Sequence, residues 1–179
     1  MSRPRKPRPP LERAQLSDLA LHYAGRYMTT AKKLEDYLRR KLRERGWAGD
    51  GDPPVDEIVA KCVEQRFVDD EAYAAAKSDA LLRRGYGAQR ISQALHHAGV
   101  SGDIRDEHAP EERDRRMAAL ALARRRRFGP FSRVTVDQPL REKQVAAMMR
   151  AGHAPHHARA IVDARSENEA EEWVADTED

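Results

Sequence analysis

The sequence predicts an all-helical chain built from three consecutive three-helix units. Apolar residues recur at spacings of three and four along most of the chain, as they do on one face of an α-helix. One helix ending also occurs three times, as Leu42-x3-Gly46, Leu95-x3-Gly99 and Met148-x3-Gly152, with the glycines 53 residues apart both times. Units that cannot bury their inner faces alone stack on their neighbours, so we expect an elongated, solenoid-like array.

The first unit, residues 16–68, contains three predicted helices. The first begins near Ser17, and the second is capped by Thr29 or Thr30 and ends at Gly46. Asp52, followed by two prolines, marks the start of the third. The predicted inward faces are Leu19, Ala20, Tyr23, Ala24 and Tyr27 on the first helix, Leu34, Leu38 and Leu42 on the second, and Ile58, Val59, Cys62 and Val63 on the third.

The second unit, residues 69–110, begins with an acidic helix start. Asp69 is placed to cap the helix, with Asp70 and Glu71 in its first turn. Its predicted inward face is Tyr73, Ala76 and Ala80. Gly85 ends this helix and Gly87 loosens the chain; Ile91 and Leu95 mark the inner side of the next helix, and a short third helix follows Ser101.

The third unit, residues 111–165, repeats the pattern. Its first helix is expected over 111–127, with Met117, Leu120 and Ala121 inward, and its second over 138–151, after Asp137. Val145 and Met148 form the apolar face of the second helix, and Ala158, Ile161 and Val162 mark the last helix.

The hydrophobic core is predicted to be thin and the charge to be segregated. The chain has 28 alanines, and Leu, Ile, Val and Phe together number only 30 of 179 residues. Residues 166–179 hold seven acidic and no basic residues, so the net charge of +3 leaves +10 on residues 1–165. Such a body favours an anionic partner, either nucleic acid or an acidic protein surface. We interpret 1–15 as a basic, proline-rich disordered arm. Residues 166–179 are read as an acidic tail that competes for the basic residues or only confers solubility, with a short helix around Trp173.

Several functional classes are excluded. The single cysteine, Cys62, rules out an internal disulfide, and no apolar run approaches the roughly 18 residues of a membrane span, so a cytoplasmic protein without a membrane partner is expected. His153 and His157 are four residues apart, but no carboxylate or cysteine stands beside them at ligand spacing, so we expect no metal. No phosphate-binding glycine loop, serine elbow or catalytic triad signature is present, and we predict a non-enzyme without a cofactor.

A family resemblance adds to this picture. The run Asp69-Asp70-Glu71-x-Tyr73, followed by Arg84-Gly85-Tyr86-Gly87 and Ile91-x3-Leu95-x3-Gly99-Val100, closely resembles the central repeat of the RecX family. The resemblance implies helix-turn-helix-like units over roughly 17–165. It also implies a negative regulator of the RecA recombinase that lies in the groove of the RecA–DNA filament. There it would inhibit ATP hydrolysis, strand exchange and the co-protease activity in recombination, DNA repair and the SOS response. We expect this regulator to be a monomer.

Three basic clusters, one in each unit, are the predicted partner-binding residues. They are Arg39, Arg40 and Arg43; Arg83, Arg84 and Arg90 with Tyr86; and Arg124, Arg125, Arg126 and Arg127. A continuous basic stripe would follow a filament or a nucleic-acid strand. The plain alternatives are solubility and a favourable helix C-terminus for the arginine run. For Tyr86, the alternatives are a base-stacking role and a plug at a repeat interface. The alternative function is an autonomous helix-turn-helix-like protein that binds single-stranded or duplex DNA.

Overall fold

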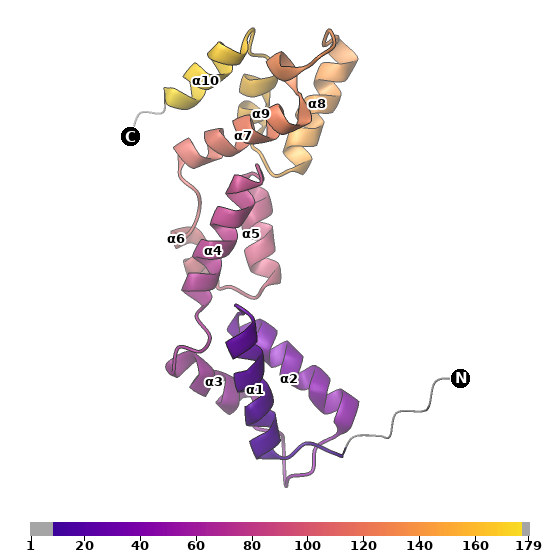
Figure 1. Cartoon of the computed structure of the whole chain (residues 1–179), viewed down its shortest axis with the longest axis vertical. Helices are drawn as coiled ribbons and strands as arrows, with labels where there is room; N and C mark the ends of the chain where they lie inside the picture. Colours follow the sequence, from indigo (N-terminus) through magenta and orange to yellow (C-terminus); the bar gives the residue numbers. More distant parts are fainter. Residues whose placement is uncertain (1–8, 177–179) are drawn as a thin grey trace, which may run out of the picture. The chain divides into compact units, whose positions relative to one another are not determined.

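The computed structural model describes residues 9–176, which form helices and no β-strand (Figure 1). The predicted all-α class is confirmed. The helices are α1 (Arg13–Arg26), α2 (Ala31–Arg45), α3 (Val55–Glu64), α4 (Asp70–Arg83), α5 (Ala88–His97), α6 (Gly102–Glu107), α7 (Glu112–Arg126), α8 (Gln138–Arg150), α9 (Pro155–Val162) and α10 (Glu167–Ala175), with a 3-10 turn η1 (Gly129–Phe131). Within the described range, no helix combines the length and apolar character that crossing a bilayer requires.

These residues divide into two compact units. The first runs up to Tyr73 and includes Ala98–Val100, and the second contains Ala74–His97 and the chain from Ser101 onward. The division into three repeats, at 16–68, 69–110 and 111–165, stays a prediction.

In the first unit, α1, α2 and α3 pack against one another around a leucine-rich core. Leu16, Leu34 and Leu38 are fully buried. The Thr30 side chain accepts a hydrogen bond from the Lys33 N–H, which confirms the predicted cap of α2. On α3, Ile58, Val59 and Cys62 are buried as predicted. Val63 is 43% exposed, so that part of the prediction was wrong.

Residues 11–15, which were predicted to belong to a disordered arm, are part of the fold. Leu11 is fully buried; its N–H donates to the Gly46 carbonyl at 2.9 Å, and its own carbonyl accepts from Ala48. Helix α1 begins at Arg13, so residues 11–15 are part of the fold and the prediction of disorder there was wrong. An apolar side chain directly after the prolines explains this, since its burial offsets the cost of ordering the backbone. Residues 1–8 of the arm lie outside the described residues.

The second unit is built around α7, which is buried on more than one side. Ala118, Ala119, Leu122 and Ala123 are buried in addition to the predicted Leu120, whereas the predicted Met117 is 51% exposed and Ala121 is also exposed. Helices α9 and α10 and the η1 turn all pack against α7. A single inward stripe cannot describe such a helix.

A similar shift occurs on α4. Tyr73 is buried as predicted, but Ala76 is exposed and Ala80 only half-buried. The buried positions are instead Ala74, Ser78 and Leu81. Alanine at five of the positions from 72 to 80 gives several equivalent stripes, so helical periodicity could not select the correct one.

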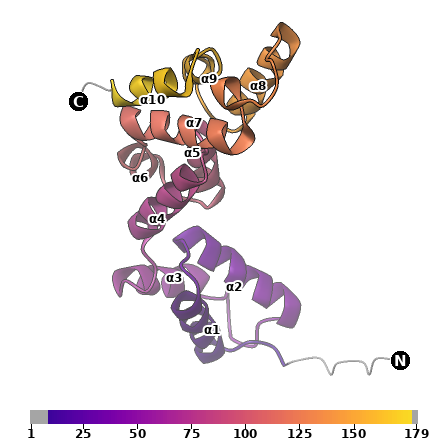
Figure 2. The same ribbon diagram turned by 45° about the horizontal axis from the view of Figure 1, so that its top comes forward.

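The predicted acidic tail is a packed helix for most of its length. Figure 2 shows α10 lying along α7, and Ala170 is fully buried while Trp173 and Val174 pack on the core of the second unit. Ser166 caps α10 by accepting from the Glu169 N–H. The expected short helix around Trp173 is therefore present, and 166–176 is a structural element; residues 177–179 lie outside the described range.

The glycines of the repeated helix ending share a positive φ. Gly46, Gly99 and Gly152 all have positive φ, at 84°, 79° and 95°, and Gly85 has φ 70°. This region of φ is costly for residues with a Cβ atom, which explains why the sequence repeats glycine at these points.

Gly87 is needed for a different reason. A Cβ atom on Gly87 would lie 2.2 Å from the carbonyl oxygen of Gly152 and 2.4 Å from the backbone nitrogen of His153. The Gly87 N–H donates to the Ala151 carbonyl at 3.0 Å, and the Gln89 N–H to the Gly152 carbonyl at 3.2 Å. The corner between α4 and α5 thus lies backbone against backbone on the turn between α8 and α9.

Replacing Gly87 by alanine is expected to destabilise the protein. The added methyl group would meet backbone atoms that cannot rotate away, and overpacking of this kind costs roughly 1–3 kcal/mol. The matched control is Gly25→Ala, because a Cβ atom at Gly25 in α1 meets nothing within 4 Å and alanine favours a helix by about 0.5–1 kcal/mol. Thermal melting should show a lower Tm for Gly87→Ala and an unchanged or higher one for Gly25→Ala. Equal Tm values for the two variants would contradict the close approach.

Candidate partner-binding site

A basic pocket of about 450 Å³ lies at the corner between α4 and α5. We call it the corner pocket. Its lining residues are Lys77, Leu81 and Arg84 from the α4 side, Tyr86 from the corner, and Arg90, Gln93, Ala94 and His97 from α5. The spacings of four and three residues along both segments place these side chains on one face of each helix.

The lining of the corner pocket contains three permanent cations and no carboxylate. Arg84 and Arg90 are exposed, and the Arg84 guanidinium lies 5.5 Å from the centroid of the half-buried Tyr86 ring. Cations on the rim of a concave surface attract anions, and arginine matches the planar geometry of carboxylates and phosphates. The arrangement suits an anionic group with a flat portion that can contact Tyr86.

The backbone beneath the corner pocket is fixed by His153. Its Nε2 donates to the Gly85 carbonyl at 3.0 Å, and the side chain is only 3% exposed. At Gly85, an added Cβ atom would lie 2.9 Å from the Leu122 nitrogen of α7. Together with the Gly87 contact, these interactions hold the segment that carries Arg84 and Tyr86.

Arg83 faces away from this pocket. It lines a separate hollow of about 280 Å³ with Asp79 and Asp114, next to α7. Arg83 and Arg84 are consecutive on the chain and therefore point about 100° apart around the helix axis. Of the four residues predicted for the middle cluster, the structure brings together Arg84, Tyr86 and Arg90.

The predicted cluster on α2 is largely paired with nearby carboxylates. Arg39 donates to Glu35 at 2.6 Å and to Asp56 at 2.9 Å, and Arg40 lies 3.7 Å from Glu44. The hydrogen bonds from Arg39 and Lys32 lower the pKa of Glu35. Arg43 is exposed. Exposed pairs of this kind contribute little stability, so a polyanion can displace them.

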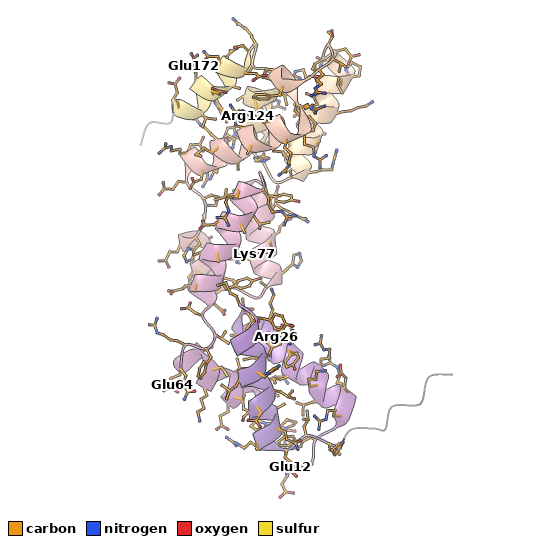
Figure 3. All side chains as sticks on the ribbon, in the orientation of Figure 1. Glu12, Arg26, Glu64, Lys77, Arg124 and Glu172 are labelled. Carbon is orange, nitrogen blue, oxygen red and sulfur yellow. The ribbon has the colours of Figure 1, made fainter. Side chains whose placement is uncertain are left out.

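The arginine run at the end of α7 is divided between two environments. Arg124 pairs with Glu171 of α10 and lies 5.6 Å from the Phe131 ring centroid. Arg125, Arg126 and Arg127 are exposed, and Arg127 ends the helix with a left-handed φ of 58°. Figure 3 labels Arg124 on α7 and Glu172 on the neighbouring α10. The α2 cluster belongs to the first unit and the other two clusters to the second; their alignment in one stripe stays a prediction.

Known proteins resemble this chain over most of its length. The family model described as the second three-helix domain of RecX matches residues 69–108, the segment that carries the corner pocket. A regulatory protein RecX from Myxococcus xanthus (strain DK1622) is 32% identical over 170 residues, which cover 90% of this chain and 89% of the relative. This chain belongs to the RecX family.

Further comparisons extend the similarity to another relative and to solved folds. A regulatory protein RecX from Agrobacterium fabrum is 30% identical and covers 88% of this chain and 86% of its own length. The crystal structure of RecX from Lactobacillus salivarius has a TM-score of 0.66 at 18% identity, covering 84% of this chain and 94% of that one. A second crystal structure of regulatory protein RecX gives 0.67 at 21% identity, covering 84% and 71%. The helical fold is thus that of known RecX structures.

One carboxylate–histidine contact in this RecX-family chain was missed from the sequence. Glu112 of α7 lies beside His157 of α9, with its Oε1 2.9 Å from Nε2, although we expected no carboxylate near these histidines. Arg116 donates to the same oxygen at 2.8 Å and also to the Trp173 carbonyl at 2.7 Å. Burial raises the pKa of Glu112, but the hydrogen bonds from Arg116 and His157 outweigh it and leave the pKa lowered. The ligand atoms of Glu112, His156 and His157 lie within 4.8 Å of one another, a grouping that the sequence did not reveal. The hydrogen bond from Arg116 to the Trp173 carbonyl connects α7 to α10.

The pocket residues that we did not predict could have been found from the sequence. Lys77 lies seven residues before Arg84, and Gln93 and His97 lie three and seven after Arg90. Those intervals return to the same helix face. Extending the family motif by helical spacing would have found them.

His153 gives a pH dependence with a defined sign. Burial lowers its pKa below the ordinary value of about 6.5, and this outweighs the hydrogen bond to the Gly85 carbonyl, which raises it. The unfolded chain therefore binds more protons at mildly acidic pH, and the free energy of unfolding falls as pH drops below about 6.5.

The measurement is thermal melting between about pH 7.5 and pH 5.5, where ordinary carboxylates stay ionised. Wild type should lose stability across this range, and His153→Gln, which cannot titrate, should lose less. The control His96→Gln changes an exposed histidine and should retain the wild-type slope. If Tm changes with pH equally in His153→Gln and in wild type, His153 is not the source of the pH dependence.

Proposed function

We propose that this protein is a negative regulator of a RecA-type recombinase in recombination and DNA repair. In this proposal it binds in the groove of the RecA–DNA filament and inhibits ATP hydrolysis, strand exchange and co-protease activity. Membership of the RecX family supports the regulatory role. The observation that carries the site is the corner pocket, where Arg84 and Arg90 flank Tyr86 without a carboxylate in the lining.

The pocket supports binding by position and by charge. A filament presents nucleic-acid phosphates and protein side chains at regular intervals, so a regulator needs cations held in a fixed geometry. The backbone contacts of Gly85 and Gly87 hold the corner, so little conformational freedom is lost on binding. The exposed Arg125, Arg126 and Arg127 add long-range attraction.

The proposed inhibition needs no catalytic group on this chain. A bound protein shifts a conformational equilibrium only by its difference in affinity between the two states. A regulator that contacts neighbouring protomers and favours one filament geometry therefore slows ATP hydrolysis and strand exchange together. The protein acts in the cytoplasm, without a cofactor, as a binding partner.

The test is the steady-state ATPase rate of RecA on single-stranded DNA as this protein is added. Wild type should lower the rate at near-stoichiometric amounts. The double variant Arg84→Glu/Arg90→Glu should need at least about tenfold more protein for the same inhibition, because each charge-assisted hydrogen bond contributes about 1.5–3 kcal/mol and about 1.4 kcal/mol is tenfold.

A matched control separates the pocket from general electrostatics. Arg133→Glu/Arg159→Glu reverses two exposed arginines of the same unit outside the pocket. Each reversal removes two charges, so both double variants lower the net charge from +3 to −1. The control should inhibit like wild type. If both double variants lose the same amount of inhibition, the corner pocket is not the binding site. If wild type affects neither ATP hydrolysis nor strand exchange by RecA, the proposed function is wrong.

A further inference from the structure

Three tyrosines lie together on the surface of the first unit, two of them stacked and the third tilted against one of these two. The Tyr23 ring of α1 lies parallel to the Tyr37 ring of α2, with centroids 4.2 Å apart and an angle of 16° between the planes. Tyr27, the residue that follows α1, contacts Tyr23. Their ring centroids are 5.3 Å apart, and the angle between the ring planes is 50°. We call these three residues the tyrosine stack.

Exposure increases along the tyrosine stack. Tyr23 and Tyr37 are half-buried and pack on the core of the first unit. Tyr27 is 51% exposed, and its neighbour Met28 is 66% exposed. Tyr23 packs against Tyr27 from the protein side, and about half of Tyr27 faces solvent. The Tyr27 ring is therefore already held by a contact when a ligand arrives. A ligand that stacks on it loses little side-chain entropy to form the contact.

Cations accompany the tyrosine stack along its length. The Arg26 guanidinium is 5.6 Å from the Tyr27 ring centroid, and Arg40 and Lys41 are 5.5 and 5.8 Å from the Tyr37 centroid. Glu44 pairs with both Arg40 and Lys41, so the group keeps a net charge of +2. Figure 3 labels Arg26 at the end of α1.

We propose that the tyrosine stack binds single-stranded nucleic acid directly, with an unpaired base on Tyr27 and phosphates at Arg26, Arg40 and Lys41. Aromatic rings interleaved with cations are the combination by which single strands are held without sequence preference. An acidic peptide would satisfy the cations but would leave the aromatic face unused. A duplex keeps its base faces stacked internally and cannot offer one to Tyr27.

This site is separate from the corner pocket and does not rest on the proposed function. Its residues all belong to the first unit, whereas the corner pocket belongs to the second. The test therefore uses the full chain without RecA. Failure of the one proposal leaves the other standing.

The experiment measures fluorescence anisotropy of labelled oligothymidylate and of an abasic strand with the same number of phosphates. Wild type should bind the strand with bases more tightly. Tyr27→Leu should weaken that binding about 5- to 100-fold, because stacking contributes about 1–3 kcal/mol per base and about 1.4 kcal/mol is tenfold. Binding of the abasic strand should be unchanged by the substitution.

Two control variants make the result specific. Tyr27→Phe keeps the ring and should bind oligothymidylate nearly as wild type. Phe67→Leu removes an aromatic side chain that is equally exposed at 51% in the same unit, and it should have no effect. Far-ultraviolet circular dichroism and melting of Tyr27→Leu should match wild type, so that the loss reports the ring and not the fold.

The remaining arms identify the ligand. Oligouridylate also has bases that can stack on Tyr27, so binding to it supports the proposal as well. Whichever of the two strands binds more tightly indicates whether the natural ligand is DNA or RNA. Equal affinity for abasic and base-bearing strands, or full competition by polyglutamate of the same charge, would overturn it in favour of a surface for acidic proteins. An unchanged affinity in Tyr27→Leu would overturn it as well.

Discussion

The corner pocket depends on one contact between two stretches of backbone. Gly87 lies so close to Gly152 that neither position has room for a side chain: a Cβ atom at Gly152 would lie 2.4 Å from the Arg90 nitrogen. Residues 65 positions apart in the chain are thereby fixed together at the start of α5. Because Arg84, Tyr86 and Arg90 flank this point on the chain, the glycines determine where the pocket cations lie. Gly152, from the repeated helix ending, and Gly87, from the corner between α4 and α5, thus have a structural role that reaches the candidate site.

Around this contact, the protein is held together by thin apolar layers supplemented with polar connections. Alanines such as Ala119, Ala123 and Ala158 are fully buried and let helices approach closely, yet each removes little apolar area from water. Polar groups then attach elements that the core holds weakly. In the second unit, Glu112 and Arg116 bind α9 and α10 to α7, and in the first, the Thr30 hydroxyl donates to the Ala98 carbonyl. The Thr30–Ala98 hydrogen bond is buried and the other two are partly buried. Breaking such bonds is costly because the polar groups left behind are shielded from water.

The sequence predicted the helix starts, which depend on neighbouring residues. It did not predict which helix faces are buried or which side chains pair, because these depend on segments far apart in the chain. Helix starts at Thr30, Asp69, Ser101 and Asp137 follow from side-chain capping within three residues, and each is present. The inward faces of α4 and α7 were assigned incorrectly, because alanine-rich helices leave the choice of buried stripe to their neighbours. The packing of α10 was missed because its acidic residues obscured Ala170 and the two apolar residues three and four positions after it, Trp173 and Val174. At the site, the family motif contained Arg84 and Tyr86, and Arg90 was predicted as a basic residue beside it. The carboxylate partners of Arg39 and Arg124 lie on other helices and were not visible from the sequence.

The carboxylate partners decide which basic residues are most available to bind an anion. Net charge treats every arginine alike, but Arg39, Arg40 and Arg124 already lie beside carboxylates, and an incoming anion must first displace them. Such exposed pairs are weak, so displacement costs little at one site but adds up along a chain of contacts. Arg84 and Arg90 line a pocket whose own walls carry no carboxylate. A partner that bound there would be attracted by both cations without displacing a carboxylate from the lining. Helix α10 pairs with only part of the basic surface: Glu171 lies beside Arg124, whereas the residues that line the corner pocket include no acidic side chain. Recognition by this protein is therefore expected to begin where the fold has left positive charge unpaired, and the number of basic residues in a segment is a poor guide to that place.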